Sequence, residues 1–380
     1  MTKDSRPRVA VIGAGAFGGW TALRMQEKGA DVVLVDGWGP GNSRSSSGGE
    51  TRVFRHSYDS RHNVDLACRS LPMWHDYCQR WGLQLFRKTG VLFATQGGEF
   101  LDLARVHLEE AGVEHEILNA REMTTRLPQM NGEGLLWGIF EPQAGYLLAR
   151  RACEAVVEAF IRGGGEFRRQ TIGHGAIDRA TLDTLSGEKR LHADVYVFAC
   201  GPWLPQLFPD LLGGLVRPTR QEVFYFGTPP DTNYLEDDVM PVWADLGEQF
   251  WYGIPGNEGR GFKVANDTHG AAIDPTACDR VPTEAALDAA RNYLAHRFPT
   301  MVDAPLLEAR VCQYSNTPDG QFILDRHPAM DDVWLLGGGS GHGFKHGPAL
   351  GDLAASCVLD NLTSEPLFRL DRFSADARAD

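Results

Sequence analysis

Three glycines near the start of the chain have the spacing of a nucleotide-binding turn. Gly13, Gly15 and Gly18 follow one another as GxGxxG, and Asp36 comes a short way further on. In such a turn the first glycine makes the tight bend, the second lets a pyrophosphate approach the backbone, and the third lets a helix pack closely on a strand. A carboxylate such as that of Asp36 can accept a hydrogen bond from a ribose hydroxyl. These residues therefore predict a dinucleotide site.

The elements that must position these residues follow in the right order. Residues 9–12 form a continuous apolar run, as expected of a strand buried on both faces, and residues 20–28 have the apolar positions of a helix. A second apolar strand at 31–35 ends at Asp36. The N-terminus of the helix would present free N–H groups to the phosphates. This context makes the motif far more specific than GxGxxG alone, although it does not separate FAD from NAD.

The chain after Asp36 separates the two dinucleotides. A loop rich in glycine and serine at 37–49 is followed by 50–56 (ETRVFRH), and not by the next strand and helix of an NAD-binding domain. A further buried strand comes only at 194–200 (DVYVFAC), just before Gly201 and Trp203. FAD-dependent amine oxidases have this order, with the nucleotide-binding half split by insertions. We therefore expect FAD.

A second glycine-rich turn lies near the C-terminus. Residues 334–336 are predicted to form a strand, 337–345 the turn and 348–362 a helix. The positive N-terminus of that helix would face whatever lies in the turn. It could stabilise the negative charge that a reduced flavin carries near N1 and the C2 carbonyl. A plain strand–turn–helix connection is the alternative.

Eight separated blocks carry a resemblance that covers nearly the whole chain. They are VIGAGAFG (11–18), GGETRVFRHSY (48–58), KTGVLF (88–93), FACGPW (198–203), YGIP (252–255), GFK (261–263), CQYSNTPDGQFILDRHP (312–328) and GGSGHGFK (338–345). Together they resemble the monomeric sarcosine oxidase and N-methyltryptophan oxidase family, within the D-amino-acid-oxidase-like flavoproteins. The resemblance implies an α/β (α+β) fold, with a Rossmann-like FAD-binding domain and a substrate domain built on an antiparallel sheet. We expect the FAD-binding domain at 1–85, 145–220 and 310–375, and the substrate domain at 86–144 and 221–309.

The resemblance assigns roles to several basic residues. Arg55 and Lys345 match the pair that holds the substrate carboxylate, and a guanidinium with an ammonium suits that task. Arg52 matches a residue placed near the flavin. The alternative is that one of these arginines pairs with a local acid, such as Glu50 or Asp59.

Two further residues match functional positions of the family. Cys312 matches the cysteine that carries the flavin covalently, through a thioether to the 8α-methyl carbon, and a thiolate needs a basic or hydrogen-bonding environment. A lone cysteine is otherwise usually a small buried residue. Lys263 matches the lysine that activates oxygen, although an exposed lysine is the default on a strand. The complete set of residues expected at the cofactor is Gly13, Gly15, Ala16, Phe17, Gly18, Asp36, Ser47, Thr51, Arg52, Ile172, Gly201, Trp203, Cys312, Gly341, Gly343, Phe344 and Lys345.

The substrate cavity is expected to be apolar, with a few placed polar groups. Tyr252 and Tyr314 would line it, and His342 would contact the flavin edge or the substrate. Ordinary core packing is the alternative for the tyrosines. If the amine binds in its neutral form, no side-chain base is required.

Departures from the family pattern bear on the substrate. Ile254 and Trp243 stand where the family has a phenylalanine and a methionine around the sarcosine pocket. Residues 264–267 (VAND) replace a common Gly-Tyr-His run. We therefore expect a pocket of changed shape. A bulkier N-alkyl amino acid or a cyclic imino acid such as pipecolate is as plausible a substrate as sarcosine.

The leading functional hypothesis is an FAD-dependent oxidase of secondary amines, namely N-alkyl or cyclic α-amino acids. It would oxidise the C–N bond to an imine and reduce O2 to H2O2. The alternatives are a flavin-dependent amine dehydrogenase that passes electrons to a protein or quinone, and a biosynthetic tailoring oxidase acting on a cyclic imino acid. A non-catalytic flavoprotein would need none of the three basic residues Arg55, Lys263 and Lys345. An NAD-dependent dehydrogenase is the most distant alternative.

Bulk properties limit the partners. The net charge of -13 argues against non-specific binding to nucleic acid or to an anionic membrane. No apolar stretch reaches the roughly 20 residues of a spanning helix, and residues 1–8 lack the apolar core of a secretory signal. Seven scattered cysteines without a CxxC pair indicate neither a disulfide framework nor a metal site. We expect a cytoplasmic monomer whose partners are a small-molecule amine or amino acid and molecular oxygen.

Overall fold

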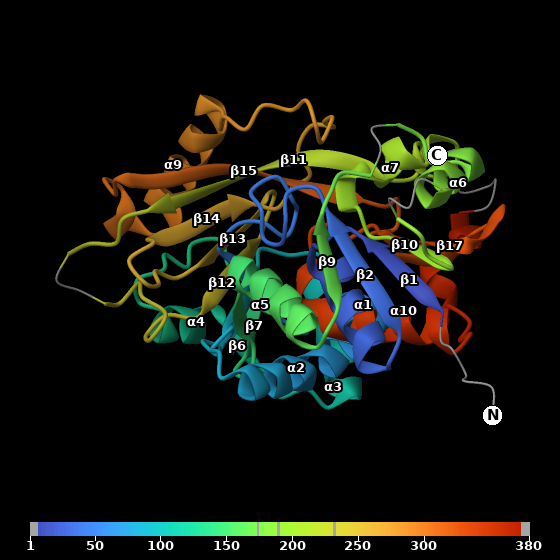
Figure 1. Ribbon diagram of the computed structural model, residues 1–380. Helices are drawn as coiled ribbons and strands as arrows, with labels where there is room; N and C mark the ends of the chain where they lie inside the picture. Colours follow the sequence, from blue (N-terminus) through green and yellow to red (C-terminus); the bar gives the residue numbers. More distant parts are fainter. Residues whose placement is uncertain (1–6, 173–174, 188–190, 231–232, 374–380) are drawn as a thin grey trace.

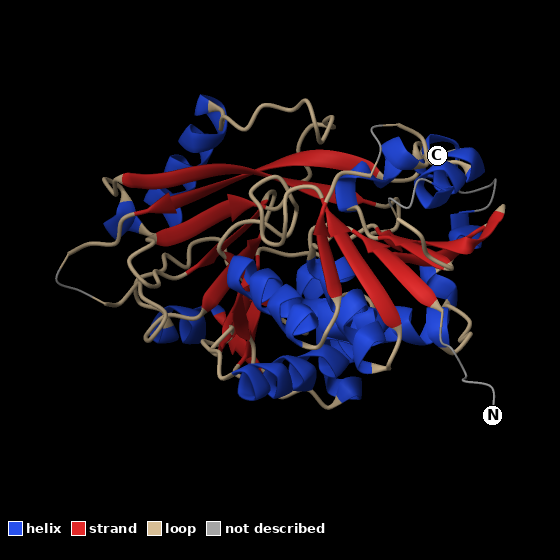
Figure 2. Ribbon diagram, viewed as in Figure 1, coloured by secondary structure: helices blue, strands red, loops and turns tan. Residues whose placement is uncertain are grey.

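The protein has three β-sheets with helices packed around them (Figures 1 and 2). The computed structural model describes residues 7–172, 175–187, 191–230 and 233–373. The polar start of the chain at 1–6 and the end of the predicted FAD-binding domain at 374–375 lie outside these ranges. The helices are α1 (Ala16–Glu27), α2 (Arg61–Trp81), α3 (Phe100–Ala111), α4 (Ala120–Arg126), α5 (Ala149–Arg162), α6 (Arg179–Gly187), α7 (Leu204–Leu207), α8 (Pro209–Leu212), α9 (Glu284–Arg297) and α10 (Gly347–Leu359). Short 3-10 helices are η1 (Gly201–Trp203), η2 (Pro299–Met301), η3 (Gly343–His346), η4 (Pro366–Phe368) and η5 (Leu370–Phe373).

A six-stranded sheet carries the predicted nucleotide-binding turn. Its order is β16-β17-β10-β1-β2-β9, and every neighbouring pair is parallel except β16 with β17. The strands are β1 (Arg8–Ile12), β2 (Asp31–Asp36), β9 (Glu166–Arg169), β10 (Val195–Phe198), β16 (Ile323–His327) and β17 (Met330–Gly337). Because β1, β2, β10 and β17 run the same way, their carboxyl ends meet at one edge of the sheet. In an open parallel sheet a ligand binds at that edge.

Both faces of this sheet are covered. Successive residues of β1 alternate between two hydrophobic cores, with Val9 and Val11 in one and Ala10 and Ile12 in the other. The first core contains residues of α1, α2, α5 and α10, and Figure 1 shows α1, α5 and α10 gathered beside β1, β2 and β9. The second core contains residues of α6 to α8. The prediction of a strand buried on both faces is confirmed.

Helices α1 and α10 pack against each other at very short range. A Cβ at Gly351 would come within 2.7 Å of the backbone of Trp20, so only a glycine allows this approach. Both helices begin after a strand of the parallel sheet, α1 after β1 and α10 after β17 by way of η3. Their N-termini therefore lie at the same edge of the sheet.

An eight-stranded sheet carries three of the six residues predicted to be catalytic, namely Tyr252, Lys263 and Tyr314. Its order is β15-β11-β14-β13-β12-β5-β7-β6, antiparallel throughout except for β12 with β5. The strands are β5 (Val91–Thr95), β6 (Glu116–Asn119), β7 (Trp137–Glu141), β11 (Arg217–Phe226), β12 (Val242–Leu246), β13 (Phe250–Ile254), β14 (Phe262–Asn266) and β15 (Leu306–Asn316). A three-stranded sheet joins β3 (Thr51–Phe54), β8 (Gly145–Leu148) and β4 (Phe86–Arg87). Long strands β11 and β15 run side by side across the top of Figure 1.

The expected fold, α/β with a Rossmann-like sheet and a second, largely antiparallel sheet, is confirmed. The domain boundaries stay a prediction. Helix α1 begins at Ala16 and not at residue 20, because its first turn contains Gly18 and Gly19, which carry no apolar signal. The C-terminal helix ends at Leu359, and the predicted turn before it contains the single-turn helix η3. Within the described ranges, every helix is too short or too polar to span a membrane.

Candidate active site

A groove of about 790 Å³ lies at the carboxyl edge of the six-stranded sheet. Its walls come from the turn after β1, the end of β2, the loop before β3, the segment after β10 and the turn after β17. Thirteen of the residues predicted to bind the cofactor line it: Gly13, Gly15, Ala16, Phe17, Asp36, Ser47, Arg52, Ile172, Gly201, Trp203, Gly341, Gly343 and Phe344.

The three glycines of the first turn meet different surroundings. Gly13 has φ +106°, and a Cβ there would lie 2.4 Å from the carbonyl oxygen of Ala199. A Cβ at Gly18 would lie 1.9 Å from the carbonyl oxygen of Gly13, so Gly18 serves packing and does not line the groove. A Cβ at Gly15 would meet only the side chain of Ser47 and would otherwise project into open space. The backbone at Gly15 is therefore open to a bulky ligand such as a pyrophosphate.

The carboxylate of Asp36 is already fixed by backbone N–H groups. It accepts hydrogen bonds from Ala14 N at 2.8 Å, from Trp38 N at 2.8 Å and from Gly39 N at 2.7 Å. Two carboxylate oxygens offer about four acceptor sites, so one remains for a hydroxyl group in the groove. The contact with a ribose stays a prediction.

Polar atoms without partners also mark the groove as a binding site. Ser46 Oγ and Ser315 Oγ lie on its wall, are buried, and have no hydrogen-bond partner among the described residues. Buried hydroxyl groups are normally hydrogen-bonded, so a ligand with polar atoms would complete both. Together with the open backbone at Gly15 and the N-terminus of α1, these hydroxyl groups fit FAD.

A second, smaller cavity of about 70 Å³ adjoins the groove. The two share four residues, namely Arg52, Tyr314, Gly341 and Phe344. The cavity is lined by all six residues predicted to be catalytic and by the predicted flavin-linking cysteine: Arg55, Tyr252, Lys263, Tyr314, His342, Lys345 and Cys312. Residues from β3, β13, β14, β15 and η3 thus meet around one space.

Tyr58 brings the predicted carboxylate-binding pair together. The guanidinium carbon of Arg55 lies 3.9 Å from the centre of the Tyr58 ring. Lys345 Nζ donates a hydrogen bond to the Tyr58 hydroxyl at 2.7 Å and another to His342 O at 2.8 Å. Burial and the neighbouring charge of Arg55 lower the pKa of Lys345 well below its ordinary value. Burial likewise raises the pKa of Tyr58 to about 12, so that Tyr58 is a neutral partner at physiological pH.

The expected alternative partners of these arginines are engaged elsewhere or make no ion pair. Glu50 pairs with Arg150, Arg260 and Arg310. Among the described residues, neither Arg52 nor Arg55 forms an ion pair with any carboxylate. Arg52 instead donates to backbone carbonyl groups, and Arg55 does the same with Ser57 O. A cavity with unpaired guanidinium groups attracts an anionic ligand.

Lys263 is almost fully buried on β14. Its Nζ donates to Thr51 O at 3.3 Å and lies 5.1 Å from the centre of the Tyr252 ring. Burial and the charge of Arg52 lower the pKa of Lys263 to about 7. The alternative of an exposed strand lysine is therefore wrong. Burying an amino group without a carboxylate partner is unfavourable, so this position is costly to the fold.

Cys312 lies on β15 beside Arg52. The Nη2 group of Arg52 donates to Cys312 Sγ at 3.6 Å, which supplies the basic, hydrogen-bonding environment expected for a thiolate. Cys312 and Lys345 line the small cavity and not the groove. Thr51 lines neither space, and its backbone carbonyl group accepts from Lys263 and Arg52.

His342 is a partly buried, neutral imidazole. Its Nε2 lies 3.0 Å from Gly320 O, and because a carbonyl group only accepts, the proton is on Nε2. Burial and the charge of Lys345 lower the pKa of His342 to about 3. Its Nδ1 is buried, has no hydrogen-bond partner among the described residues and is free to accept from a ligand.

The family model described as FAD dependent oxidoreductase matches residues 8–357. The chain belongs to this family. A monomeric sarcosine oxidase from Bacillus sp. (strain B-0618) is 30% identical over 371 residues, which cover 94% of each chain. An N-methyl-L-tryptophan oxidase from Yersinia pestis (strain Pestoides F) is 28% identical and covers 92% of this chain and 94% of the relative. Among solved structures, L-proline dehydrogenase from P. horikoshii has a TM-score of 0.80 at 19% identity, covering 98% of this chain and 99% of that chain.

These findings confirm the resemblance that the eight blocks indicated. They also confirm the class of enzyme, an FAD-dependent oxidoreductase of the amine and amino-acid oxidase kind. The roles of the individual site residues stay predictions, although the structure gathers nearly all of them around two adjoining spaces.

Some residues of this oxidoreductase's site were not predicted. Tyr58 lies in the block 48–58, but only the fold shows its contacts with Arg55 and Lys345. Glu141, at the end of β7, lines neither space but holds the chain next to Arg55: it accepts hydrogen bonds from the backbone and side chains of His56 and Ser57, and nothing in the sequence links these positions.

The two substitutions expected to reshape the pocket lie in different places. Trp243 is on the cavity wall. Ile254 is fully buried in a hydrophobic core and is not among the residues that line the cavity, so its expected contact with the pocket is not found. The register of β13 with β14 is regular, so the side chains of Ile254 and Tyr252 lie on the same face of β13. Tyr252 lines the cavity, but the cavity does not extend as far along the strand as Ile254.

Proposed function

We propose that the protein is an FAD-dependent oxidase of secondary α-amino acids, acting on N-alkyl or cyclic substrates. It would oxidise the C–N bond to an imine and reduce O2 to H2O2. The observation that carries this proposal is the set of three basic residues, Arg55, Lys263 and Lys345, around one small cavity that adjoins the groove. Two of them would bind an anionic substrate, and the third would serve the reaction with oxygen.

Arg55 and Lys345 would bind the substrate carboxylate. The guanidinium group offers paired donors and the ammonium group a point charge, and Tyr58 holds both in place. With its carboxylate held, a substrate would keep its reacting carbon in a fixed position, which lowers the entropic part of the barrier. Bound FAD would supply the acceptor for the hydride equivalent.

Lys263 would assist the reaction with oxygen. It faces the same cavity from β14, and its neighbours are the Thr51 carbonyl group and the Tyr252 ring. A positive charge fixed in a buried site stabilises negative charge that develops on oxygen. This residue favours the oxidase over the dehydrogenase alternative.

Cys312 would carry the flavin through a thioether to its 8α-methyl carbon. Arg52 donates a hydrogen bond to the sulfur and lines both the groove and the cavity. A cation beside the sulfur stabilises the thiolate, which is the reactive form.

The small cavity favours a compact substrate. A volume of about 70 Å³ suits a small N-alkyl or cyclic imino acid better than an N-methylated aromatic amino acid. The curated relatives are named for sarcosine and N-methyl-L-tryptophan, and a structural relative for L-proline, all of which are secondary amino acids.

We propose that the protein acts as a monomer.

The proposal is tested by anaerobic reduction of the purified flavoprotein with a panel of N-methyl and cyclic amino acids. We expect bleaching of the flavin by at least one small secondary amino acid, and one H2O2 formed per substrate when air is admitted. Bleaching without peroxide formation would favour the dehydrogenase. A flavin that no member of the panel bleaches would contradict the proposed substrate class.

A further inference from the structure

One carboxylate, that of Asp267, lines the small cavity among four basic residues. The basic residues are Arg52, Arg55, Lys263 and Lys345. Among the described lining residues, Asp267 is the one acidic side chain. It follows directly after β14, in the stretch where the sequence departs from the family pattern.

Asp267 is held in place by contacts from two strands. Its backbone N–H donates to Phe250 O at 2.7 Å, and its Oδ1 accepts a hydrogen bond from the Tyr314 hydroxyl at 2.5 Å. Within the described part of the chain, Oδ2 has no hydrogen-bond partner. The carboxylate is thus fixed through one oxygen and can offer the other to a ligand.

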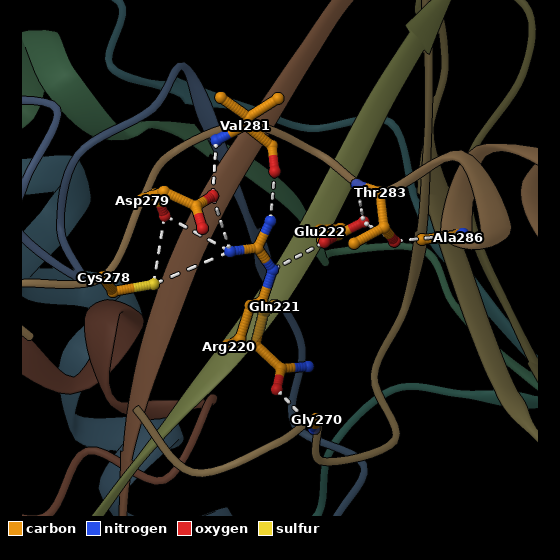
Figure 3. Close-up of polar contacts among 9 residues, drawn as sticks. All are labelled: Arg220, Gln221, Glu222, Gly270, Cys278, Asp279, Val281, Thr283 and Ala286. Atoms are coloured by element: carbon orange, nitrogen blue, oxygen red, sulfur yellow. Dashed lines mark hydrogen bonds and ion pairs between the residues drawn. The ribbon is translucent and has the colours of Figure 1, made fainter. Parts of the chain in front are cut away.

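The backbone on both sides of Asp267 is tied to Gln221, a buried residue of β11. Gln221 Oε1 accepts from Gly270 N at 3.0 Å, as Figure 3 shows, and its Nε2 donates to Thr268 O at 3.2 Å and Asn266 O at 3.5 Å. A single side chain thus spans the turn that presents Asp267. The turn is a built part of the site.

The preceding residue of β11, Arg220, fixes the far end of the same segment. Its guanidinium group donates to Asp279 O at 3.2 Å, to Cys278 Sγ at 3.6 Å and to Val281 O (Figure 3). It also pairs with Glu222, which accepts from Thr283 at the start of α9. The segment from Asp267 to α9 is therefore anchored to β11 at both ends.

The opposite charges share the cavity without touching. Within the described residues, no Arg or Lys side chain comes within the 4.0 Å of an ion pair with Asp267, although all five charged side chains line the same small space. The carboxylate nevertheless acts on the cations, since it raises the pKa of Lys345 against the larger lowering by burial and Arg55. A ligand with both charges could pair its negative group with the basic side chains and its positive group with Asp267.

We propose that Asp267 determines specificity by binding the substrate amine as its ammonium form. This inference rests on the proposed function and deepens it: the cavity selects zwitterionic α-amino acids, with the carboxylate at Arg55 and Lys345 and the ammonium group at Asp267. It differs from the expectation of a neutral amine in an apolar cage. A charged hydrogen bond in a partly buried site is strong enough to govern selection.

The test is a binding comparison on the flavin-loaded protein under anaerobic conditions at pH 7. One probe is N,N-dimethylglycine, whose nitrogen is cationic, and the other is methoxyacetate, which keeps the carboxylate but has a neutral ether oxygen. Binding of each is followed by the change in flavin absorbance, so the readout does not need turnover. We expect the wild-type protein to prefer the cationic probe, and Asp267→Asn to reduce that preference by about 10- to 100-fold while the Kd for methoxyacetate is nearly unchanged.

Asp59→Asn is the matched control, because Asp59 is an exposed carboxylate next to Tyr58 but outside the cavity. It should leave both Kd values unchanged. If Asp267→Asn fails to retain flavin, Asp267→Ser replaces it. A preference that survives the loss of the carboxylate, or a wild-type protein without any preference, overturns the inference. Failure of the proposed function would appear separately, as a wild-type flavin that no secondary amino acid bleaches.

Discussion

Replacing Lys263 with methionine should make the protein more stable at neutral pH while impairing its reaction with oxygen. Burial and Arg52 lower the pKa of Lys263 from 10.5 to about 7. In the unfolded chain the amino group keeps its proton up to the higher value. Between pH 7 and about 10.5 the unfolded state therefore binds more protons, and the free energy of unfolding of the wild-type protein rises with pH. A methionine has a similar length but binds no proton, so it adds no such pH dependence to the free energy of unfolding.

The size of the effect follows from the same pKa. One pKa unit corresponds to about 1.4 kcal/mol, so the wild-type protein should gain about 2 kcal/mol relative to Lys263→Met between pH 7 and pH 9. At pH 7 the variant should be the more stable of the two. The measurement is urea unfolding followed by tryptophan fluorescence at both pH values. Lys88→Met is the control, since Lys88 is exposed and its amino group donates a hydrogen bond to the Gln143 side chain at 3.3 Å.

The same variant separates the two half-reactions. Loss of a fixed charge that stabilises developing negative charge should slow reoxidation by O2 on the order of 10²- to 10³-fold, with much less effect on reduction by substrate. Stopped-flow measurement of each half-reaction checks this. Equal effects on both half-reactions would refute the role in oxygen activation. A variant that is less stable at pH 7, with a deficit that does not change with pH, would refute the electrostatic reasoning.

Three further predictions test other parts of the site. Cys312→Ala should release all flavin into the supernatant on acid precipitation, whereas the wild-type pellet should stay yellow; a colourless wild-type pellet would exclude the thioether. Gly15→Ala should weaken flavin binding with little change in the thermal stability of the apoprotein, because the added Cβ projects into the groove. Gly18→Ala should instead destabilise the fold itself, because its Cβ would lie 1.9 Å from a carbonyl oxygen. Flavin titration and thermal unfolding measure the two effects, and a Gly15→Ala apoprotein that is less stable than Gly18→Ala would contradict this reasoning. Burial tends to raise the pKa of Glu141, but hydrogen bonds and the charge of His56 outweigh burial and lower that pKa to about 2. Ionised Glu141 should therefore contribute about 3 kcal/mol to the free energy of unfolding above about pH 4.5, and this contribution is lost as the pH falls toward 2. Glu141→Gln should flatten this acid dependence in unfolding measured from pH 7 to pH 3.

Much of the nucleotide-binding part was predictable because its rules are local. The turn after β1, helix α1 and strand β2 follow one another within 36 residues, and each glycine of the turn has a conformational or packing reason that sequence spacing expresses. The start of α1 was the exception. Its first turn contains Gly18 and Gly19, which pack against the Gly13 carbonyl oxygen and against Val156 of α5, and such close packing leaves no apolar periodicity in the sequence.

The sequence by itself determined the dinucleotide turn, the split of the nucleotide-binding half and, through its separated blocks, the membership of the family. It also supplied the residue types of the cavity. Only the tertiary structure decided that Lys263 is buried, that Tyr58 joins Arg55 to Lys345, and that Asp267 faces the same space without an ion pair to any described residue. The physical reason is that these contacts join strands and turns far apart in the chain. Sheet register and burial set which charges meet, and neither can be read from the spacing of residues along the sequence.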